Sequence, residues 1–546
     1  MKIKILLFSI LLLAFSFRFF KLAQFPSTLY GDEQAFAWNA YNILKLGQDE
    51  YGNPYPLQFR SFEDYKAPIP TYLLVPFIKL LGLSTFAIRL PIALASILSV
   101  AVTFLLARVF FNRKASLIIS FLMAISPWHI HLSRGFFEAT LALLLFLLGV
   151  YFFLLHRQNL KFIVVSMIFF GLSMYSYFVP RILVPIFLPF LIWYMLKYKE
   201  QKFSKIFKLQ YILKDFWLGL LILILISLPL LKLTFFEKGA SRFNKLLDLT
   251  NPVVENTVWK ERLASNLSDR FKILFHNKVT VWMRIIKNNY LEQLSPNFWY
   301  IYGDSSLRYF LGNMGMFYLI EFPFLIMGLY FLWREKRSAA IFFIGWILLA
   351  ALPASLVGKA FAVRSLQMVP AIFMFVGYGL YKSILLVSRI KNRSNLFSFI
   401  IVIFFVLSLG NVLIRYYFEY PVYAATWWGW ENKAAIDYAK NFETQYDYIF
   451  ISNFYTGATL TYAVYNSYDP IEYRMAVQNP VVMVDGRHLV KLGKYYFGSL
   501  DIDEERLQQN IIPAKSLYIA RPEEADSKET INAPDDGRVL FIIHKT

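Results

Sequence analysis

Two adjacent carboxylates, Asp32 and Glu33, are the first residues of this chain whose types could do chemistry. They lie in "LYGDEQAFAWNAY" (29–41), directly after a hydrophobic segment. A positioned carboxylate can act as a general base and take the proton of an attacking hydroxyl or amine. An acid at the start of a helix over "QAFAWNAYNILK" would also be favoured by the helix dipole, by about 0.3–1 kcal/mol. That structural role explains one acid but does not require two.

A third acid, Glu138, lies in "SPWHIHLSRGFFEATL" (126–141), at the start of a later hydrophobic segment. Four basic residues occupy similar positions beside hydrophobic segments: Lys66, Arg134, Arg181 and Arg364. Each alone is typical of a lipid headgroup contact or a helix-end anchor. Together they could hold a phosphate through charge-assisted hydrogen bonds. Acids and bases at one membrane surface indicate an enzyme that acts on a lipid-linked phosphate.

Metal and nucleotide motifs are absent from the sequence. His129 and His131 are two residues apart, without an HExxH pattern, which is typical of interfacial polar residues, although His131 and Arg134 are also candidate contacts of this second loop. No phosphate-binding P-loop, dinucleotide fingerprint or GxSxG elbow occurs. A divalent ion shared by Asp32 and Glu138 stays open, since two carboxylates are too few ligands to define a site.

Composition predicts a membrane protein. The 546 residues are 57% hydrophobic and 17% charged, against about 25% charged in soluble domains. The apolar residues form blocks of about 17–25 residues, the length that crosses a bilayer. There are no cysteines, which excludes disulfides and thiolate metal sites. The net charge is +26 up to residue 418 and −6 beyond it, which indicates topology signals and membrane-lipid contacts, not nucleic acid.

Eleven membrane spans are expected. They cover 3–22, 86–110, 115–130, 137–155, 162–178, 182–196, 216–235, 313–333, 339–357, 365–387 and 395–418. The first is predicted to be an uncleaved helix, because no small-residue cleavage site follows it. The run 69–83 is short and contains two prolines, with a third directly before it at Pro68, so we expect a helix at the membrane interface there.

The distribution of Lys and Arg orients these spans. The loops on one side carry 17 such residues and the short loops on the other side carry 4, which predicts a cytoplasmic N-terminus. Loops 23–85 and 236–312 and the tail 419–546 then face outward. The tail is expected to be a small α/β domain, with strands in "YDYIFIS", "ATLTYAVY" and "PVVMVDG" and a helix over 431–442. The fold class is therefore an all-α polytopic membrane domain, 1–418, followed by an extracytoplasmic α/β domain.

These segments together resemble a known family. "YGDEQAFAWNAYNILKLGQDEYGNPYPLQF…EDYKAPIPTYLL", "SPWHIHLSRGFFEATL", the stretch 295–333 and "VRSLQMVPAIFMFVGYGL" occur in the order found in GT-C glycosyltransferases. The likeness is greatest to protein O-mannosyltransferases, the lipid A aminoarabinose transferase and their bacterial relatives. It covers roughly residues 1–420 and does not extend into the tail.

The resemblance implies a transferase that moves a sugar from a polyprenyl-phosphate carrier to a protein, lipid or glycan acceptor. It implies the outer face of a bacterial plasma membrane, with an archaeal membrane as the alternative. Asp32 matches the family's catalytic acid, Glu33 its neighbour, and Glu138 the acid of the second loop, where many relatives have Asp. The residues that match carrier-phosphate ligands are Lys66, Arg181 and Arg364. In-line attack would invert the anomeric carbon.

Two other functions remain open on the sequence alone. A transporter or flippase of a lipid-linked glycan would need ionisable residues near the middle of its spans, and these spans are nearly free of acids. A non-enzymatic adhesion or scaffold protein would need the tail to be the main functional part. The acids at the outer rim favour catalysis over both.

Overall fold

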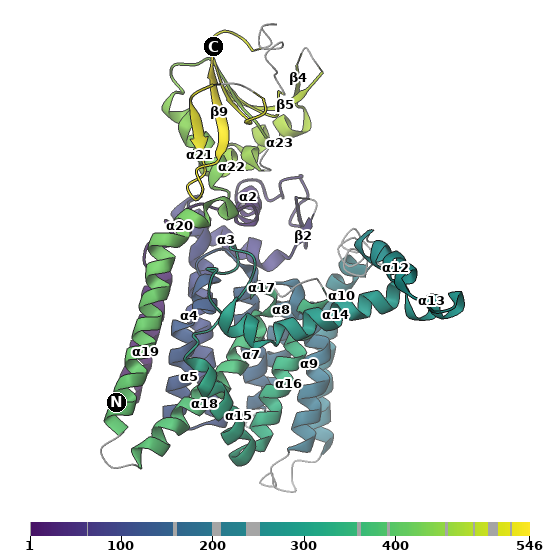
Figure 1. Ribbon diagram of the computed structural model, residues 1–546, viewed down its shortest axis with the longest axis vertical. Coiled ribbons are helices and arrows are strands. Elements are labelled where there is room, and N and C mark those ends of the chain that lie inside the picture. Colours follow the sequence, from purple (N-terminus) through teal and green to yellow (C-terminus); the bar gives the residue numbers. More distant parts are fainter. Residues whose placement is uncertain are drawn as a thin grey trace.

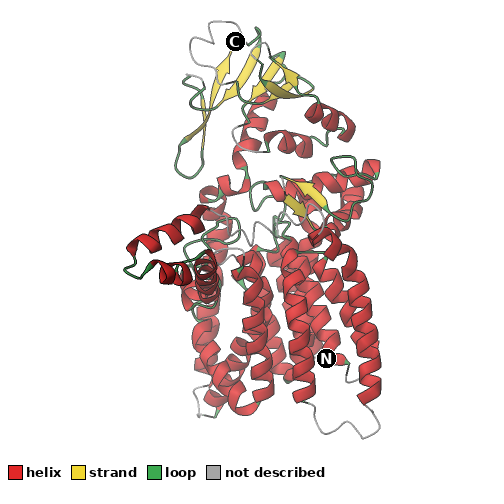
Figure 2. Ribbon diagram, turned by 90° about the vertical axis from the view of Figure 1, so that its right-hand side faces the viewer, coloured by secondary structure: helices red, strands yellow, loops and turns green. Residues whose placement is uncertain are grey.

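The computed structural model describes residues 2–62, 64–156, 161–198, 209–235, 252–356, 362–389, 394–453, 457–483, 486–500, 512–524 and 527–546. A bundle of long helices forms one end of the molecule, and the C-terminal domain forms the other (Figures 1 and 2). The N-terminus lies at the end of the bundle away from that domain (Figure 1). Short helices and a hairpin separate these two parts, and the candidate site lies among them.

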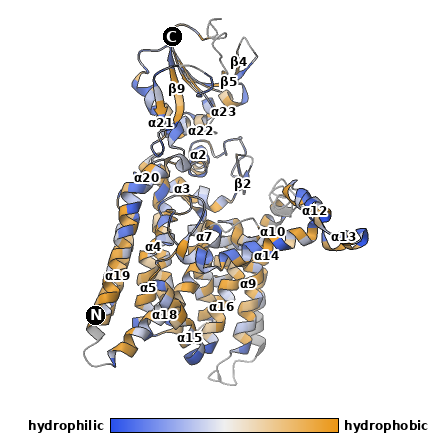
Figure 3. Cartoon of the chain, viewed as in Figure 1, coloured by the Kyte–Doolittle hydropathy of each residue, from blue (hydrophilic) through white to orange (hydrophobic). Residues whose placement is uncertain are grey.

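Each of the eleven predicted spans coincides with an apolar helix. These are α1 (Lys2–Phe19), α4 (Thr85–Phe110), α5 (Arg113–Ile125), α7 (Glu138–Leu155), α8 (Lys161–Met174), α9 (Phe178–Lys197), α10 (Leu209–Phe235), α15 (Glu321–Glu335), α16 (Arg337–Ser355), α18 (Val369–Ser388) and α19 (Ser394–Ile414). Within the described ranges, six helical stretches are each long and apolar enough to cross a bilayer. The helices of the bundle are hydrophobic along most of their length (Figure 3). The protein is a multi-pass membrane protein.

One predicted span begins later than expected. The prediction was 313–333, but α15 starts at Glu321. Asn313 has a positive φ of 52°, and Gly315 lies against the backbone of Tyr300, where a Cβ atom would be 2.2 Å from a carbonyl carbon. This close approach keeps residues 313–320 in an irregular loop that packs on a short π-helical turn, η1 (Asn297–Ile301).

The loop 23–85, which was predicted to face outward, builds a layer between the bundle and the C-terminal domain. It contains α2 (Gly31–Leu46), the antiparallel strands β1 (Phe59–Ser61) and β2 (Asp64–Lys66), and α3 (Pro68–Leu81). α3 is the apolar helix predicted over 69–83, and it packs against both α2 and α4. The hairpin ends at Lys66, which is thereby held beside the start of α2.

The loop 236–312, also predicted to face outward, forms a helical arm in its described part. It contains α12 (Pro252–Ala264), α13 (Asp269–Phe275) and α14 (Lys278–Gln293), which project sideways from the upper part of the bundle (Figure 1). A predicted part of this loop, 236–251, and much of the predicted cytoplasmic loops 156–161, 197–214 and 388–393 lie outside the described residues.

The tail is an α/β domain, as predicted. Its helices are α20 (Tyr420–Tyr423), α21 (Trp430–Asn441), α22 (Ala458–Tyr465) and α23 (Pro470–Gln478). Its strands are β3 (Tyr448–Ile451), β4 (Val481–Val482), β5 (His488–Leu492), β6 (Tyr495–Phe497), β7 (Ser516–Ala520), β8 (Thr530–Asn532) and β9 (Val539–Lys545). They form one sheet in the order β4-β5-β6-β3-β7-β9-β8, in which β3 runs parallel to β6 and β7. The helices lie between this sheet and the bundle (Figure 2).

The strand predicted in "ATLTYAVY" is wrong, because these residues form α22. The Thr, Tyr and Val residues favour a strand by propensity, but packing overrides that preference. Leu460, Ala463 and Val464 are buried at helical spacing, and α22 packs on α2. The strand predicted in "YDYIFIS" and the helix predicted over 431–442 are present as β3 and α21.

Candidate functional site

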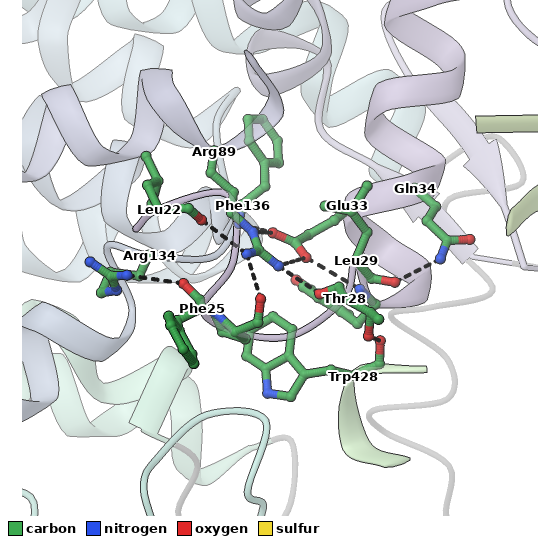
Figure 4. A network of polar contacts seen from close by, with 12 residues as sticks. Leu22, Phe25, Thr28, Leu29, Glu33, Gln34, Arg89, Arg134, Phe136 and Trp428 are labelled. Atoms are coloured by element: carbon green, nitrogen blue, oxygen red, sulfur yellow. Dashed lines mark hydrogen bonds and ion pairs between the residues drawn. The ribbon is translucent and has the colours of Figure 1, made fainter. Parts of the chain in front are cut away.

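Glu33 is fully buried and forms an ion pair with Arg89 of α4. Arg89 Nε donates to Glu33 Oε1 at 3.0 Å and Nη2 to Oε2 at 3.2 Å. The same carboxylate accepts the backbone N–H of Phe136 at 2.7 Å and that of Tyr30 at 3.2 Å. Figure 4 shows this network. Because the Glu33 oxygens accept hydrogen bonds from protein donors, the residue ties together α2, α4 and the segment around Phe136, before α7.

Arg89 also orders the chain that leads from α1 to α2. Its guanidinium donates to the carbonyls of Leu22 at 3.2 Å, Pro26 at 2.8 Å and Thr28 at 2.6 Å. A planar fork of five N–H donors suits such a set of acceptors. The segment 22–28 is thereby fixed, and with it the start of α2, where Asp32 lies.

Arg134 has a similar structural position. It is fully buried, and it donates to the carbonyls of Phe17 and Phe20 at 2.8 Å and of Phe25 at 3.1 Å. These carbonyls belong to the end of α1 and the following turn, where helical acceptors lack partners. Arg134 therefore holds the end of α1 and does not belong to an exposed cationic surface.

Asp32 points away from this network and pairs with Lys66. Lys66 Nζ donates to Asp32 Oδ1. The lysine side chain is 7% exposed, whereas that of Asp32 is 39% exposed. The lysine ammonium also lies 5.2 Å from the centre of the Phe36 ring. The carboxylate of Asp32, the candidate base, is thus accessible, and the ammonium of Lys66 is buried beside the Phe36 ring.

Four charged side chains from separate segments act on the phenol of Tyr309. Burial raises the pKa of Tyr309, Arg308 and Arg364 oppose that shift, and the negative charges of Asp32 and Glu138 reinforce it. The pKa of the neighbouring Tyr30 is raised by burial and then by Asp32 and Glu138. Asp32, Glu138 and Arg364, which the sequence singled out far apart, therefore all lie within electrostatic reach of Tyr309.

Arg364 is positioned through Asp304. The Asp304 carboxylate accepts the backbone N–H of Ala362, at the start of α17 (Ala362–Ser365), and that of Ser306 at 2.8 Å. The carbonyl of Ala362 accepts the indole N–H of Trp128 at 3.0 Å. Burial raises the pKa of Asp304 to about 6, although its two backbone hydrogen bonds and Arg364 act against this shift.

His131 fixes the backbone of Arg308. It lies in the short helix α6 (Pro127–His131), and its Nε2 atom is 2.9 Å from the Arg308 carbonyl. Because a carbonyl only accepts, Nε2 carries the hydrogen. Burial lowers the pKa of His131 to about 4, so the ring is neutral at neutral pH. His131 thus holds the backbone at Arg308 through this hydrogen bond.

Arg181 lies at the turn between α8 and α9. Its Nε atom donates at 3.0 Å to the carbonyl of Met174, the residue before Tyr175. The Tyr175 carbonyl accepts the backbone N–H of Ile69, at the start of α3. These contacts place Arg181 near the start of α3, which directly follows the Lys66 hairpin.

A polar cavity of about 260 Å³ lies at the exposed carboxylate. Its polar lining includes Asp32 and Gln34 of α2, Arg308, Glu431 and Asn432 of α21, and Thr461 of α22. The cavity is somewhat smaller than the about 300–1,000 Å³ of sites for drug-sized ligands. It therefore suits a single sugar-sized group.

Metal ligands do not cluster in the described part of the chain. No group of three or more His, Asp or Glu residues there could hold an ion. Asp32 and Glu138 would supply two carboxylates, too few for the oxygen-rich coordination of Ca²⁺ or Mg²⁺.

Sequence reasoning missed Arg89, Asp304, Arg308, Tyr309 and Glu431. Arg89 lies in a predicted span, and a buried charge there is itself a signal. Asp304, Arg308 and Tyr309 lie in "YGDSSLRYF", a polar stretch in a predicted outer loop. Glu431 lies in the tail, to which no site residue was assigned.

Residues 65–231 match the sequence model of a family described as dolichyl-phosphate-mannose-protein mannosyltransferase. The match contains Lys66, Glu138 and Arg181, covers less than half of the chain, and confirms the resemblance over these residues. No protein of curated function matches the chain in sequence.

Two solved proteins are similar in structure at low sequence identity. ArnT from Cupriavidus metallidurans in the apo state gives a TM-score of 0.49 at 14% identity, over 99% of this chain and 97% of that one. ArnT bound to undecaprenyl phosphate gives 0.49 at 13% identity, with the same coverage. The archaeal oligosaccharyltransferase AglB from Archaeoglobus fulgidus, in complex with an inhibitory peptide and a dolichol-phosphate, gives 0.47 at 15% identity, over 84% of this chain and 63% of that one.

Proposed function

We propose that this protein is an integral-membrane glycosyltransferase that moves a sugar from a polyprenyl-phosphate carrier to an acceptor, with inversion, on the face that bears the C-terminal domain. The observation that carries the proposal is the accessible carboxylate of Asp32, paired with Lys66 at the edge of a polar cavity. The matched family acts on a lipid-phosphate sugar by its description. A hexosyl and a pentosyl group both suit this chemistry.

Asp32 is the general base in this reaction. The acceptor hydroxyl or amine attacks the anomeric carbon, the bond from that carbon to the phosphate oxygen breaks, and polyprenyl phosphate leaves. The acceptor proton passes to Asp32. Glu138, whose charge reaches the same two tyrosines as that of Asp32, orients the acceptor or the sugar.

Lys66 has two anionic partners in the course of the reaction. Without substrate it pairs with Asp32. A phosphate arriving at the cavity competes for the ammonium, and its growing negative charge is stabilised there as the bond breaks. The transfer of Lys66 to the phosphate leaves the Asp32 oxygen open to the acceptor proton. Arg364 and Arg181 are the further proposed phosphate ligands.

The test is release of free polyprenyl phosphate from a panel of polyprenyl-phosphate sugars by the purified full-length protein. Wild type is compared with Asp32→Asn and with Asp437→Asn, the same change at an exposed residue that pairs with Lys433 on α21. Release from one donor that is lost in Asp32→Asn and kept in Asp437→Asn supports the proposal. Equal release by all three proteins excludes Asp32 as the base. No release from any donor by folded protein, with candidate acceptors added, favours a transporter or flippase.

A further inference from the structure

Glu431 is a buried acid of the C-terminal domain that lines the cavity. It belongs to the first turn of α21, after Gly429, which has a positive φ of 73°. Its residue is 7% exposed, and its Oε2 atom has no hydrogen-bond partner among the described residues. A buried carboxylate oxygen without a donor is costly. An acid that only served the dipole of α21 could lie in solvent.

The surroundings of Glu431 are those of a binding site for hydroxyl groups. Asp32 and Arg308 line the same cavity, together with Gln34 and Thr461. Thr461 Oγ1 donates to Gln34 Oε1 at 2.9 Å. Arg308 lies 5.1 Å from the Tyr30 ring centre, and its Nε donates to the Trp427 carbonyl at 3.1 Å. These contacts hold the cavity wall without engaging the free oxygen of Glu431.

The position of Glu431 relative to Asp32 is fixed by contacts between the two parts of the molecule. Thr28 Oγ1 donates to the Trp428 carbonyl at 2.6 Å, and the Leu29 backbone N–H donates to Tyr465 Oη at 3.0 Å. One of these contacts is two residues before α21, and the other is at the end of α22. The C-terminal domain is therefore seated on the start of α2, with Glu431 facing the cavity.

We infer that Glu431 is a substrate-positioning residue supplied by the C-terminal domain, whose carboxyl receives a hydroxyl group of the donor sugar or of the acceptor opposite Asp32. The inference rests on the proposed function and deepens it, because it makes the tail part of the reaction cavity. Burial raises the pKa of Glu431 to about 7, while its own backbone N–H, Arg308 and Arg538 act in the opposite direction. The carboxyl can thus accept or donate a hydrogen bond at neutral pH.

The experiment compares full-length wild type, Glu431→Gln and the control Asp437→Asn. The first readout is thermal stabilisation by sugar-free undecaprenyl phosphate and by the undecaprenyl-phosphate sugar that wild type turns over. The second is the kcat and KM of polyprenyl phosphate release. We expect Glu431→Gln to keep its stabilisation by the sugar-free carrier and to lose about tenfold or more in kcat/KM, the effect of one hydrogen bond to a charged group.

The two readouts also separate the two sources of the hydroxyl group. A loss of stabilisation by the sugar-bearing donor assigns Glu431 to the donor sugar. Unchanged donor stabilisation with a lower kcat assigns it to the acceptor. Wild-type values in both readouts would overturn the inference. So would a lower melting temperature with loss of carrier binding, because Glu431 would then be structural.

The failure of the proposed function has a different signature. If wild type releases no polyprenyl phosphate from any donor, the panel of undecaprenyl-phosphate sugars is used for stabilisation alone. A sugar-dependent stabilisation that disappears in Glu431→Gln then supports the binding role without the transfer reaction. No difference between the variant and wild type overturns that role as well.

Discussion

The carboxylates of Asp32 and Glu33 are neighbours in the chain but lie in different environments. Asp32 pairs with Lys66 beside a polar cavity, and Glu33 pairs with Arg89 in the protein interior. Successive residues of a helix point about 100° apart, so the first turn of α2 can present one acid to each environment. The pair thus separates the chemical role that we propose for Asp32 from the structural role of Glu33.

Glu33→Gln is expected to destabilise the protein more than Asp32→Asn does, because both partners of the Glu33–Arg89 pair are fully buried whereas Asp32 is partly exposed. The first change leaves the buried Arg89 without its anion, and breaking one partner of a buried ion pair costs about 3–5 kcal/mol. Thermal unfolding of the two purified variants checks this difference. Equal melting temperatures for Glu33→Gln and wild type would contradict the structural role of Glu33.

Lys66→Ala is expected to raise the KM for the lipid-linked donor at least tenfold, because a charge-assisted contact to the phosphate is lost. Lys66→Arg keeps the positive charge and should retain part of the affinity. The KM of polyprenyl phosphate release measures both. An unchanged KM in Lys66→Ala would show that Lys66 serves only to hold Asp32.

Glu431→Gln is expected to gain stability over wild type as the pH rises from about 4.5 to about 7. The pKa of Glu431 is about 7 in the folded protein against an ordinary value of 4.5. In that interval the unfolded chain loses the proton first, so wild type loses up to about 1.4 kcal/mol of stability per pH unit. Unfolding midpoints of both proteins across this interval test it. A pH-independent difference would contradict the assigned pKa.

His131→Gln is expected to reduce the loss of stability in acid. The pKa of His131 is about 4 in the folded state, against an ordinary value of 6.5. As the pH falls from about 6.5 to about 4, the His131 side chain binds a proton in the unfolded state but not in the folded state. Wild type then loses up to about 1.4 kcal/mol per pH unit from this group. Gln has no such titration and retains an N–H donor, so its stability curve should be flatter below pH 6.5.

Much of the fold was predictable because apolar length is a direct signal. The eleven helices were found from their hydrophobic blocks, and β3 and α21 from local patterns. The α22 helix was not, because its Thr and Tyr residues favour a strand and its contacts with α2 are more than 400 residues away in sequence. The late start of α15 depends on the approach of Gly315 to Tyr300, which no local pattern reveals.

The charged residues to which we assign chemistry were predictable, but the residues that position them were not. Asp32 and Lys66 follow from residue type at the edge of a hydrophobic segment. The roles of Arg89, His131 and Asp304 depend on backbone carbonyls and N–H groups that fold against them. Residue type alone gives no information on such partners.

The contact of Thr28 with Trp428 joins residues 400 positions apart. The ribosome therefore makes the helices α1 to α19 before it makes the residues of α21 and α22 that line the cavity. The nascent chain carries Asp32 and Lys66 beside an unfinished cavity, whose lining is complete only when α21 and α22 have been made and contact the segment before α2. The proposed transfer activity would then depend on the docking of α21 and α22 onto a membrane domain that is already made.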